Sequence, residues 1–244
     1  MNALKHIITR ELSSYFSTPL AYVFIVIFLT LIGSLTFYIG NFFVRGQADL
    51  YAFFAFHPWV YILLIPAVTM RLWAEERKTG TIELLTTLPL TTTQAVLGKF
   101  LAALIFIFVS LFLTFPLWIT VNYLGDPDNG VILAGYIGSL FMAGAYLSIG
   151  SCISAITKNQ VIAFVIATTV CFLFTMSGLD LVLNFFKLWA PEFLVDTISS
   201  MSFLTHFDSI TKGVIEIRDF LFYLSVITFW IFLNIIIIEY KKFN

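Results

Sequence analysis

The sequence predicts an all-α integral membrane protein with six transmembrane helices. Of its 244 residues, 60% are hydrophobic and only 11% are charged, and the mean hydropathy is +0.98. A soluble domain is about 45–50% apolar and about 25% charged, so this chain has too little polar surface to cover a water-soluble globule. The composition excludes a soluble enzyme and a disordered scaffold, and the net charge of −1 provides no basic field for nucleic acid.

Six uncharged runs are long enough to cross a bilayer, which takes about 20 helical residues. None of them alternates apolar and polar residues as β-barrel strands do. Pro19 is expected to begin a new helix, which trims the first run to a span near residues 20–42. The runs cover residues 12–44, 50–70, 100–125, 129–157, 159–179 and 220–238.

The distribution of charge predicts that both termini lie in the cytoplasm. Nine of the thirteen lysines and arginines fall in segments on the side of the N-terminus, and cytoplasmic loops carry an excess of these residues. An even number of spans returns the C-terminus to the same side. We expect no cleaved signal peptide, because the polar lead of residues 1–18 precedes a run too long for a signal sequence.

Residues 1–18 are expected to form a helix that lies in the cytoplasmic membrane interface. Apolar side chains recur there at helical spacing and polar ones fill the opposite face. The helix is then either an elbow that transmits motion or a simple anchor, and the residues alone favour the anchor. The apolar positions are Leu4, Ile7, Ile8, Leu12, Tyr15 and Phe16.

Two connecting segments are longer than a connection between helices requires. Residues 71–99 form a cytoplasmic segment, and residues 180–219 form an external one that is too apolar for a linker in water. The external segment predicts one or two helices that dip into the outer leaflet. They would form an exit lid or only close the fold.

The fourth run carries small residues at a small-xxx-small spacing, which permits close contact between helices. We expect this row to pack inside one subunit rather than to line a pore. Pro66 and Pro116 lie within predicted spans and are expected to kink them. The small residues are Gly135, Ser139, Ala143, Gly144 and Ser148.

No catalytic or cofactor-binding pattern stands out in this chain. It has no phosphate-binding loop and no zinc-protease or serine-hydrolase motif. No charged residue lies in the middle of a predicted span, and His57, the one ionisable candidate there, is expected to be a packing residue. Cys152 and Cys171 give neither a disulfide framework nor a metal site. We therefore expect no enzyme activity, cofactor or metal within this chain.

The cytoplasmic segment predicts a short helix held between two rigid span ends. Residues 75–78 extend the second span into water, and Gly80 is a natural helix stop. Thr81 can cap a new helix that ends at Pro89. The apolar residues of this short helix are Ile82, Leu84, Leu85 and Leu88.

The third span is expected to begin with a capping box formed by Thr91 and Gln94. The apolar face of the short helix before it requires either lipid or a groove on another protein. Docking to a partner and anchoring in the membrane both remain open on the residues alone.

The cytoplasmic segment resembles the ABC type-2 exporter permease family. Its characteristic pattern is E-x-x-x-G-T-x-E-x-L-x-x-x-P followed by G-K at the next span, and residues 76–89 with Gly98-Lys99 match it. The stretches 10–22 and 206–223 are similar to the branch that includes the gliding-motility-associated permeases. The similar positions there are Arg10, Glu11, Leu12, Tyr15, Phe16, Ser17, Pro19, Tyr22, His206, Phe207, Ser209, Lys212, Gly213, Val214, Arg218, Asp219 and Tyr223.

The resemblance implies that the chain is a single permease domain, 1–244, and half of a homo- or heterodimer in the bacterial cytoplasmic (inner) membrane. Two ATPase subunits would bind ATP and Mg below it, and residues 81–88 would be the coupling helix that enters the ATPase. Alternatively, Glu76 and Glu83 are solvated charges that only balance Arg77 and Lys78. The implied ATPase-coupling residues are Glu76, Arg77, Gly80, Thr81, Ile82, Glu83, Leu84, Leu85 and Pro89.

Two functions follow from the resemblance. The chain would couple ATP hydrolysis to export of an envelope-related substrate. Alternatively, it would transmit ATPase motion to an envelope assembly or a motility apparatus without a transported substrate. Membrane lipid and an accessory envelope subunit are possible partners in either case, and nucleic acid is not.

Overall fold

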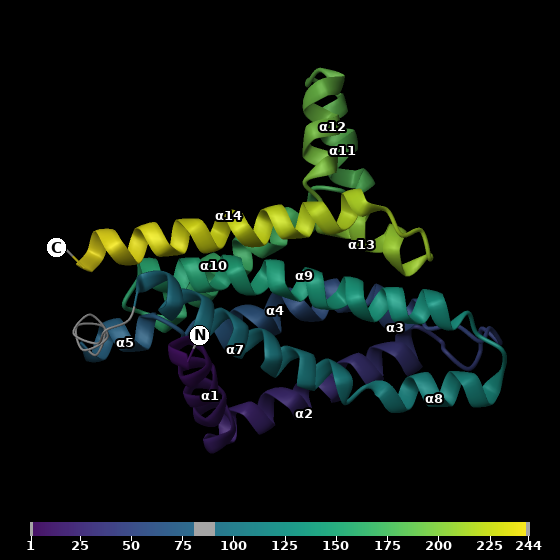
Figure 1. Ribbon diagram of the computed structural model, residues 1–244. Coiled ribbons are helices and arrows are strands. Elements are labelled where there is room, and N and C mark those ends of the chain that lie inside the picture. The colour runs from purple at the N-terminus through teal and green to yellow at the C-terminus, as the bar shows by residue number, and fades with distance from the viewer. Residues whose placement is uncertain (1, 81–90, 243–244) are drawn as a thin grey trace.

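The computed structural model describes residues 2–80 and 91–242, and within this part of the chain it contains helices and no strand (Figure 1). The helices are α1 (Asn2–Ser17), α2 (Pro19–Ser34) with the π-helical extension η1 (Leu35–Ile39), α3 (Tyr51–Ala55), α4 (His57–Thr69), α5 (Ala74–Thr79), α7 (Thr92–Phe112), α8 (Phe115–Leu124), α9 (Asn129–Ile156), α10 (Gln160–Met176), α11 (Asp180–Lys187), α12 (Glu192–Ser200), α13 (Phe203–Thr211) and α14 (Ile217–Lys242).

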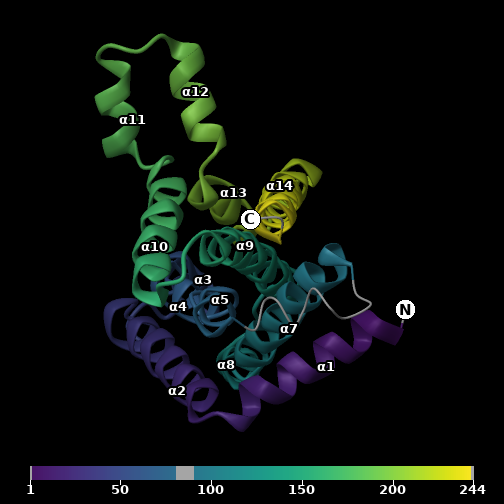
Figure 2. The same ribbon diagram turned by 90° about the vertical axis from the view of Figure 1, so that its left-hand side faces the viewer.

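The helix α9 is the central element of a bundle of long helices. It packs against α4, α7, α10, α13 and α14, and most of its side chains from Gly138 to Ala155 are buried. Figure 2 looks along the bundle and shows α9 enclosed by its neighbours. The N-terminus, the C-terminus and α5 all lie at one end of the bundle (Figure 1).

Close packing around α9 depends on its small residues. A Cβ atom on Gly135 would lie 2.5 Å from the Phe54 ring, and one on Gly138 would lie 2.8 Å from Ile210. Ser139 is buried and bonded to the Tyr61 hydroxyl at 2.8 Å. These contacts are all within one subunit, so the packing role predicted for the small residues is confirmed.

Among the residues that the structure describes, four helical segments are long and apolar enough to span a membrane, so the prediction of six spans is not confirmed. Their bounds are Ala21–Ile39, Thr92–Leu124, Asn129–Ile156 and Ile217–Lys241. A fifth candidate is α10 together with α11, which are bent by 75° at a short break. The predicted second span, residues 50–70, is divided at Phe56 into the short helices α3 and α4.

The two prolines in predicted spans have different effects. The helix α7 ends at Phe112 and α8 begins at Phe115, so Pro116 lies in the first turn of a new helix, where its missing N–H is tolerated. The span expected to be kinked at Pro116 is therefore interrupted at Leu113 and Thr114, just before the proline. Pro66 lies inside α4, which continues past it to Thr69.

His57 has the packing role that the sequence predicts. Its ring is fully buried, and the ring centre lies 4.5 Å from that of Phe53. Its Nδ1 lies 2.9 Å from the carbonyl oxygen of Phe53. Cys152 and Cys171 are both buried as free thiols. These three residues belong to the packed interior.

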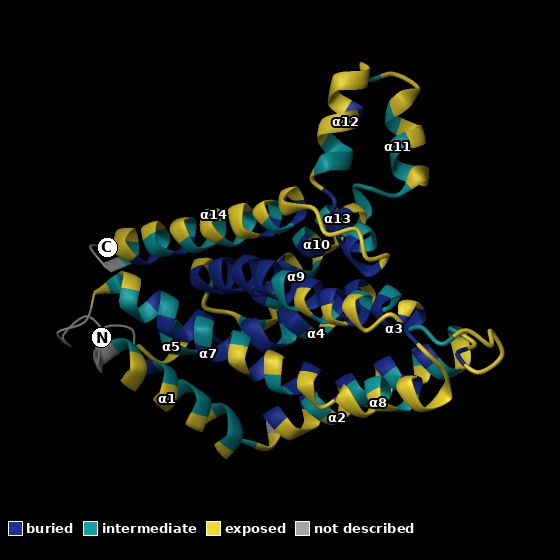
Figure 3. Cartoon of the chain, turned by 45° about the vertical axis from the view of Figure 1, so that its right-hand side comes forward, coloured by how far each residue is buried: buried dark blue, intermediate teal, exposed yellow. Residues whose placement is uncertain are grey.

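The predicted external segment forms two projecting helices and one buried helix. The helices α11 and α12 pair as a hairpin that extends away from the bundle (Figures 1 and 2), whereas α13 packs against α9. Much of the hairpin surface is exposed (Figure 3), including large apolar side chains. Those residues are Leu181, Phe185, Leu188, Trp189, Phe193 and Leu194.

We expect Gly150→Ala to lower the free energy of unfolding by about 1–3 kcal/mol, as overpacking of a core does. The new Cβ would lie 2.0 Å from Thr69 Oγ1 and 2.8 Å from Thr69 Cβ, and the β-branched threonine cannot rotate both atoms away. Thermal unfolding in detergent measures the effect. The matched control is Gly33→Ala, because a Cβ at Gly33 has no atom within 4 Å; equal losses in both variants would contradict this packing.

Candidate functional site

The helix α1 is held firmly against the end of α7 at which both chain termini lie. Gly98 of α7 permits this contact, since a Cβ there would lie 2.5 Å from Ile7 of α1. Further along, the rings of Tyr15 and Phe16 lie 5.2 Å and 5.9 Å from the ring of Phe106. The glycine and the aromatic residues fix α1 across the bundle rather than leaving it free.

A buried lysine connects α1, α5 and α7. Lys99 Nζ lies 3.3 Å from Glu11 Oε1 of α1 and 2.7 Å from Glu76 Oε1 of α5. The Lys99 side chain is only 4% exposed, and the two glutamates are 14% and 20% exposed. Its ammonium also lies 5.2 Å from the centre of the Trp73 ring. We name Glu11, Glu76 and Lys99 the charged junction.

The charged junction is held together by the cost of burying charge. An ammonium withdrawn from water is stabilised only if it is paired with opposite charge. Burial raises the pKa of Glu11, but the nearby Lys99 and Arg10 outweigh this effect, so the pKa lies below its ordinary value of 4.5. Glu11 is therefore ionised near neutral pH, and separation of either carboxylate from Lys99 would remove opposite charge from a buried ammonium.

The connection between α4 and α5 is fixed to α9 by two serines. Ser154 Oγ accepts hydrogen bonds from the backbone N–H groups of Trp73 and Ala74, each at 3.1 Å, and donates to Met70 O at 3.0 Å. A hydroxyl with two acceptor sites and one donor is then fully used. Ser151 Oγ accepts from Trp73 Nε1 at 3.2 Å.

Two cations cap the C-terminal end of α9. Arg77 Nη1 donates to the carbonyl oxygens of Ala155 and Ile156 at 3.0 and 2.7 Å, and Lys241 Nζ donates to the same two at 3.1 and 2.6 Å. Cations are favourable there because the last carbonyls of a helix lack partners and carry partial negative charge. Partial burial lowers the pKa of Arg77. Arg77 thus links α5 to the central helix.

Residues 81–88 are the predicted docking segment, and both of their flanks have the local structure that the sequence predicts. The helix α5 ends at Gly80, whose φ of +75° is the left-handed conformation that favours glycine. On the other flank, Thr91 and Gln94 form a capping box that begins α7. Thr81, Ile82, Glu83, Leu84, Leu85 and Pro89 of the predicted coupling set lie outside the described residues.

The structure brings together some of the predicted residues and adds others. Glu76 pairs with Lys99, so it is not merely a solvated charge that balances Arg77 and Lys78. Sequence reasoning noted Glu11 and Lys99 as motif positions but assigned them no role. The available signal was the position of Lys99, eight residues after the Thr91 cap, within the apolar part of α7, where an unpaired charge is costly.

The interactions in this region fix several helices to one another. Among the residues that the structure describes, no group of three or more His, Cys, Asp or Glu is placed to hold a metal ion. The charged junction, the serines of α9 and the cap at Ala155 and Ile156 all fix the position of residues 71–80 relative to the bundle. This arrangement can transmit a displacement.

The fold and this arrangement define a multi-pass helical membrane protein in which residues 71–80 are fixed to the bundle at the end that holds both termini. A family model described as ABC-2 family transporter protein matches residues 18–238, so the chain belongs to that family. It is accordingly a membrane permease component of an ABC transporter, a component that works with an ABC ATPase and is typically not catalytic itself. No curated protein matches the sequence.

We expect Lys99→Met to destabilise the protein by about 1–3 kcal/mol, because it removes the buried cation that Glu11 and Glu76 share. Thermal unfolding measures the loss, and trypsin cleavage after Arg10 reports the release of α1. Lys158→Met is the matched control, since this lysine is exposed near the same end of the bundle.

A triple variant that also carries Glu11→Gln and Glu76→Gln should recover most of that stability, because no charge then remains buried. Wild-type stability should also fall as the pH drops through the lowered pKa of Glu11, where the carboxylate takes up a proton. Equal melting temperatures for Lys99→Met, Lys158→Met and wild type would contradict the role of the charged junction.

Proposed function

We propose that this chain couples ATP hydrolysis in a separate ATPase to export of an envelope-related substrate. The observation that carries the proposal is the fixation of residues 71–80 to α1, α7 and α9 at the bundle end where both termini lie. A segment attached in this way passes a push from a partner directly to the transmembrane helices. This attachment favours docking of residues 81–88 to a partner over simple anchoring of these residues in the membrane.

Movement enters through residues 81–88, which we propose as the coupling helix. The flanks at Gly80 and Thr91 join this segment to α5 and α7, and the motif residues Thr81 and Glu83 would shape the contact with the ATPase. Displacement of α5 would pull on Glu76, and through Lys99 it would reach α1. The helix α1 then acts as an elbow in the membrane interface rather than as an anchor alone.

The proposed topology has six membrane crossings with cytoplasmic termini. The helices α3 and α4 together would form the second crossing, and α10 the fifth, with its bend into α11 at the outer surface. The excess of lysine and arginine near the end that holds both termini supports this orientation. The location would be the bacterial cytoplasmic (inner) membrane.

The working assembly would contain two permease subunits and two ATPase subunits. Exposed apolar faces on α2, α10 and α14 offer surface for lipid and for the second permease, identical or different. ATP and Mg would be bound by the ATPases. Each permease would receive force at its own coupling helix.

A second candidate function is the transmission of motion to an envelope assembly or a gliding-motility apparatus. The observation that favours it is the hairpin of α11 and α12, which projects from the bundle and exposes Leu181, Leu188 and Trp189. Such a hairpin suits an accessory envelope subunit as well as an outer-leaflet lid. A continuous cavity between two permeases would favour export, and a sealed seam would favour transmission.

We expect Glu83→Lys to reduce recovery of the ATPase with the tagged permease by about tenfold or more, the loss that corresponds to about 1.4 kcal/mol. Reversal of a charge at a docking contact replaces attraction with repulsion. A pull-down in gentle detergent measures the ratio of the two proteins. Glu239→Lys is the control, because this glutamate is exposed on α14 near the same end. Unchanged recovery with Glu83→Lys would contradict docking.

A cysteine introduced as Asp126→Cys should react with a membrane-impermeant reagent from outside intact cells, and Lys78→Cys should react only after lysis. Lys78 belongs to α5 and Asp126 to the connection between α8 and α9, and these two elements lie at opposite ends of the bundle (Figure 1). The buried Cys152 and Cys171 are replaced by alanine so that no native thiol can react with the reagent. Reversed accessibility would overturn the orientation.

A further inference from the structure

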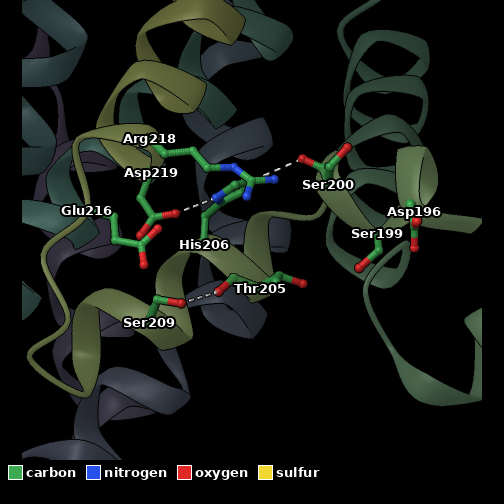
Figure 4. A pocket seen from close by; sticks show the side chains of 9 residues that line it. All are labelled: Asp196, Ser199, Ser200, Thr205, His206, Ser209, Glu216, Arg218 and Asp219. Atoms are coloured by element: carbon green, nitrogen blue, oxygen red, sulfur yellow. Dashed lines mark hydrogen bonds and ion pairs between the residues drawn. The ribbon is translucent and has the colours of Figure 1, made fainter. Parts of the chain in front are cut away.

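The hairpin of α11 and α12 is tied to the bundle by one buried histidine. His206 of α13 places Nδ1 2.6 Å from Asp219 Oδ1 of α14 and Nε2 3.0 Å from the carbonyl oxygen of Ser200, the last residue of α12 (Figure 4). The His206 and Asp219 side chains are each only 6% exposed. The imidazole thus joins the end of the hairpin to the first turn of the last helix.

The two contacts of His206 cannot both be hydrogen bonds in every protonation state. A neutral imidazole has one N–H donor and one acceptor nitrogen. Ser200 offers a carbonyl oxygen and Asp219, when ionised, offers a carboxylate oxygen, so both partners are acceptors. Both bonds form only when the pair of His206 and Asp219 holds one extra proton, either as imidazolium with carboxylate or as imidazole with carboxylic acid.

Loss of that proton acts on the hairpin. The remaining N–H stays with Asp219, because a bond to a charged acceptor is the stronger of the two. The lone pair of Nε2 then faces the lone pairs of Ser200 O across 3.0 Å, which is a repulsive contact. Ser200 O is among the last carbonyls of α12, which have no partner within their own helix. It is therefore the bond to Ser200 that breaks.

The surroundings of His206 let protons reach the ring and affect its charge. A cavity of about 430 Å³ with an all-polar lining lies beside it (Figure 4). Its charged side chains are Asp196 of α12 and Glu216, Arg218 and Asp219 around the start of α14. These residues place charges of both signs beside the ring. The Phe222 ring is stacked on the imidazole at 4.0 Å, and Tyr223 lies 6.4 Å away.

We propose that His206 is a proton-dependent latch that holds the hairpin of α11 and α12 against the bundle and releases it when the proton shared with Asp219 is lost. The latched state binds one proton more than the released state, so rising pH favours release. The latch goes beyond ATP-driven coupling, because its contacts lie on α12, α13 and the start of α14, away from the charged junction of α1, α5 and α7 (Figure 1). It makes the hairpin sensitive to the pH of the compartment that it faces.

The test is the distance between spin labels on the full chain in lipid nanodiscs, measured by pulsed electron paramagnetic resonance. Labels are placed through Leu188→Cys at the hairpin tip and Leu221→Cys on α14, both exposed, with Cys152→Ala and Cys171→Ala as background. Spectra are recorded near pH 5 and near pH 8, the range in which an imidazole changes its charge. We expect one narrow distance population at the lower pH and its loss at the higher pH.

Two variants separate the latch from a general effect of pH. Asp219→Asn should keep the narrow population at both pH values, because the new amide can donate to Nδ1 and leave the Nε2 proton for Ser200. His206→Phe should lose it at both, since the ring stays stacked but makes neither bond. His6→Phe is the matched control for an exposed histidine and should respond as wild type does.

A wild-type distance distribution that is the same at both pH values overturns the proposal. So does an Asp219→Asn variant that keeps the wild-type response to pH. Because the wild-type comparison needs no substitution at the latch, it decides the question even where a variant fails to fold.

Discussion

The arrangement at the end of the bundle that holds both termini depends on the shared neutralisation of one buried ammonium group. Lys99 is enclosed where α1, α5 and α7 meet, and it is stable there only with Glu11 and Glu76 beside it. Each carboxylate comes from a different helix, so the electrostatic requirement becomes a geometric one. The charged junction therefore links α1 and α5 to each other through Lys99 of α7.

The central helix provides the fixed frame for this arrangement. Small residues let α9 approach its neighbours closely. Ser151 and Ser154 of α9 accept hydrogen bonds from the α4–α5 connection and hold it in place. Arg77 and Lys241 then satisfy the last carbonyls of α9. The firmly held C-terminal end of α9 contrasts with the projecting hairpin of α11 and α12, where His206 contacts the carbonyl oxygen of Ser200.

The sequence predicted those parts of the fold that depend on local chemistry. Gly80 and the Thr91–Gln94 cap are local signals, and both appear as expected. The division of residues 50–70 at Phe56 was not foreseen, because hydropathy measures apolar length and not helix continuity. The partnership of Glu76 with Lys99 was also missed, since pairing between distant helices depends on tertiary packing that spacing along one chain does not encode.

The central claim is that the Glu76–Lys99 pair holds α5 in the position from which the proposed coupling helix, residues 81–88, binds the ATPase. The most direct test is a double-mutant cycle with Glu76→Gln and Lys99→Met, read as the affinity of the purified ATPase for the permease in nanodiscs. The account predicts that each single change weakens binding and that the double variant binds no more weakly than the worse single one, since both break the same interaction. Unchanged affinity in the single variants, or losses that simply add, would contradict it.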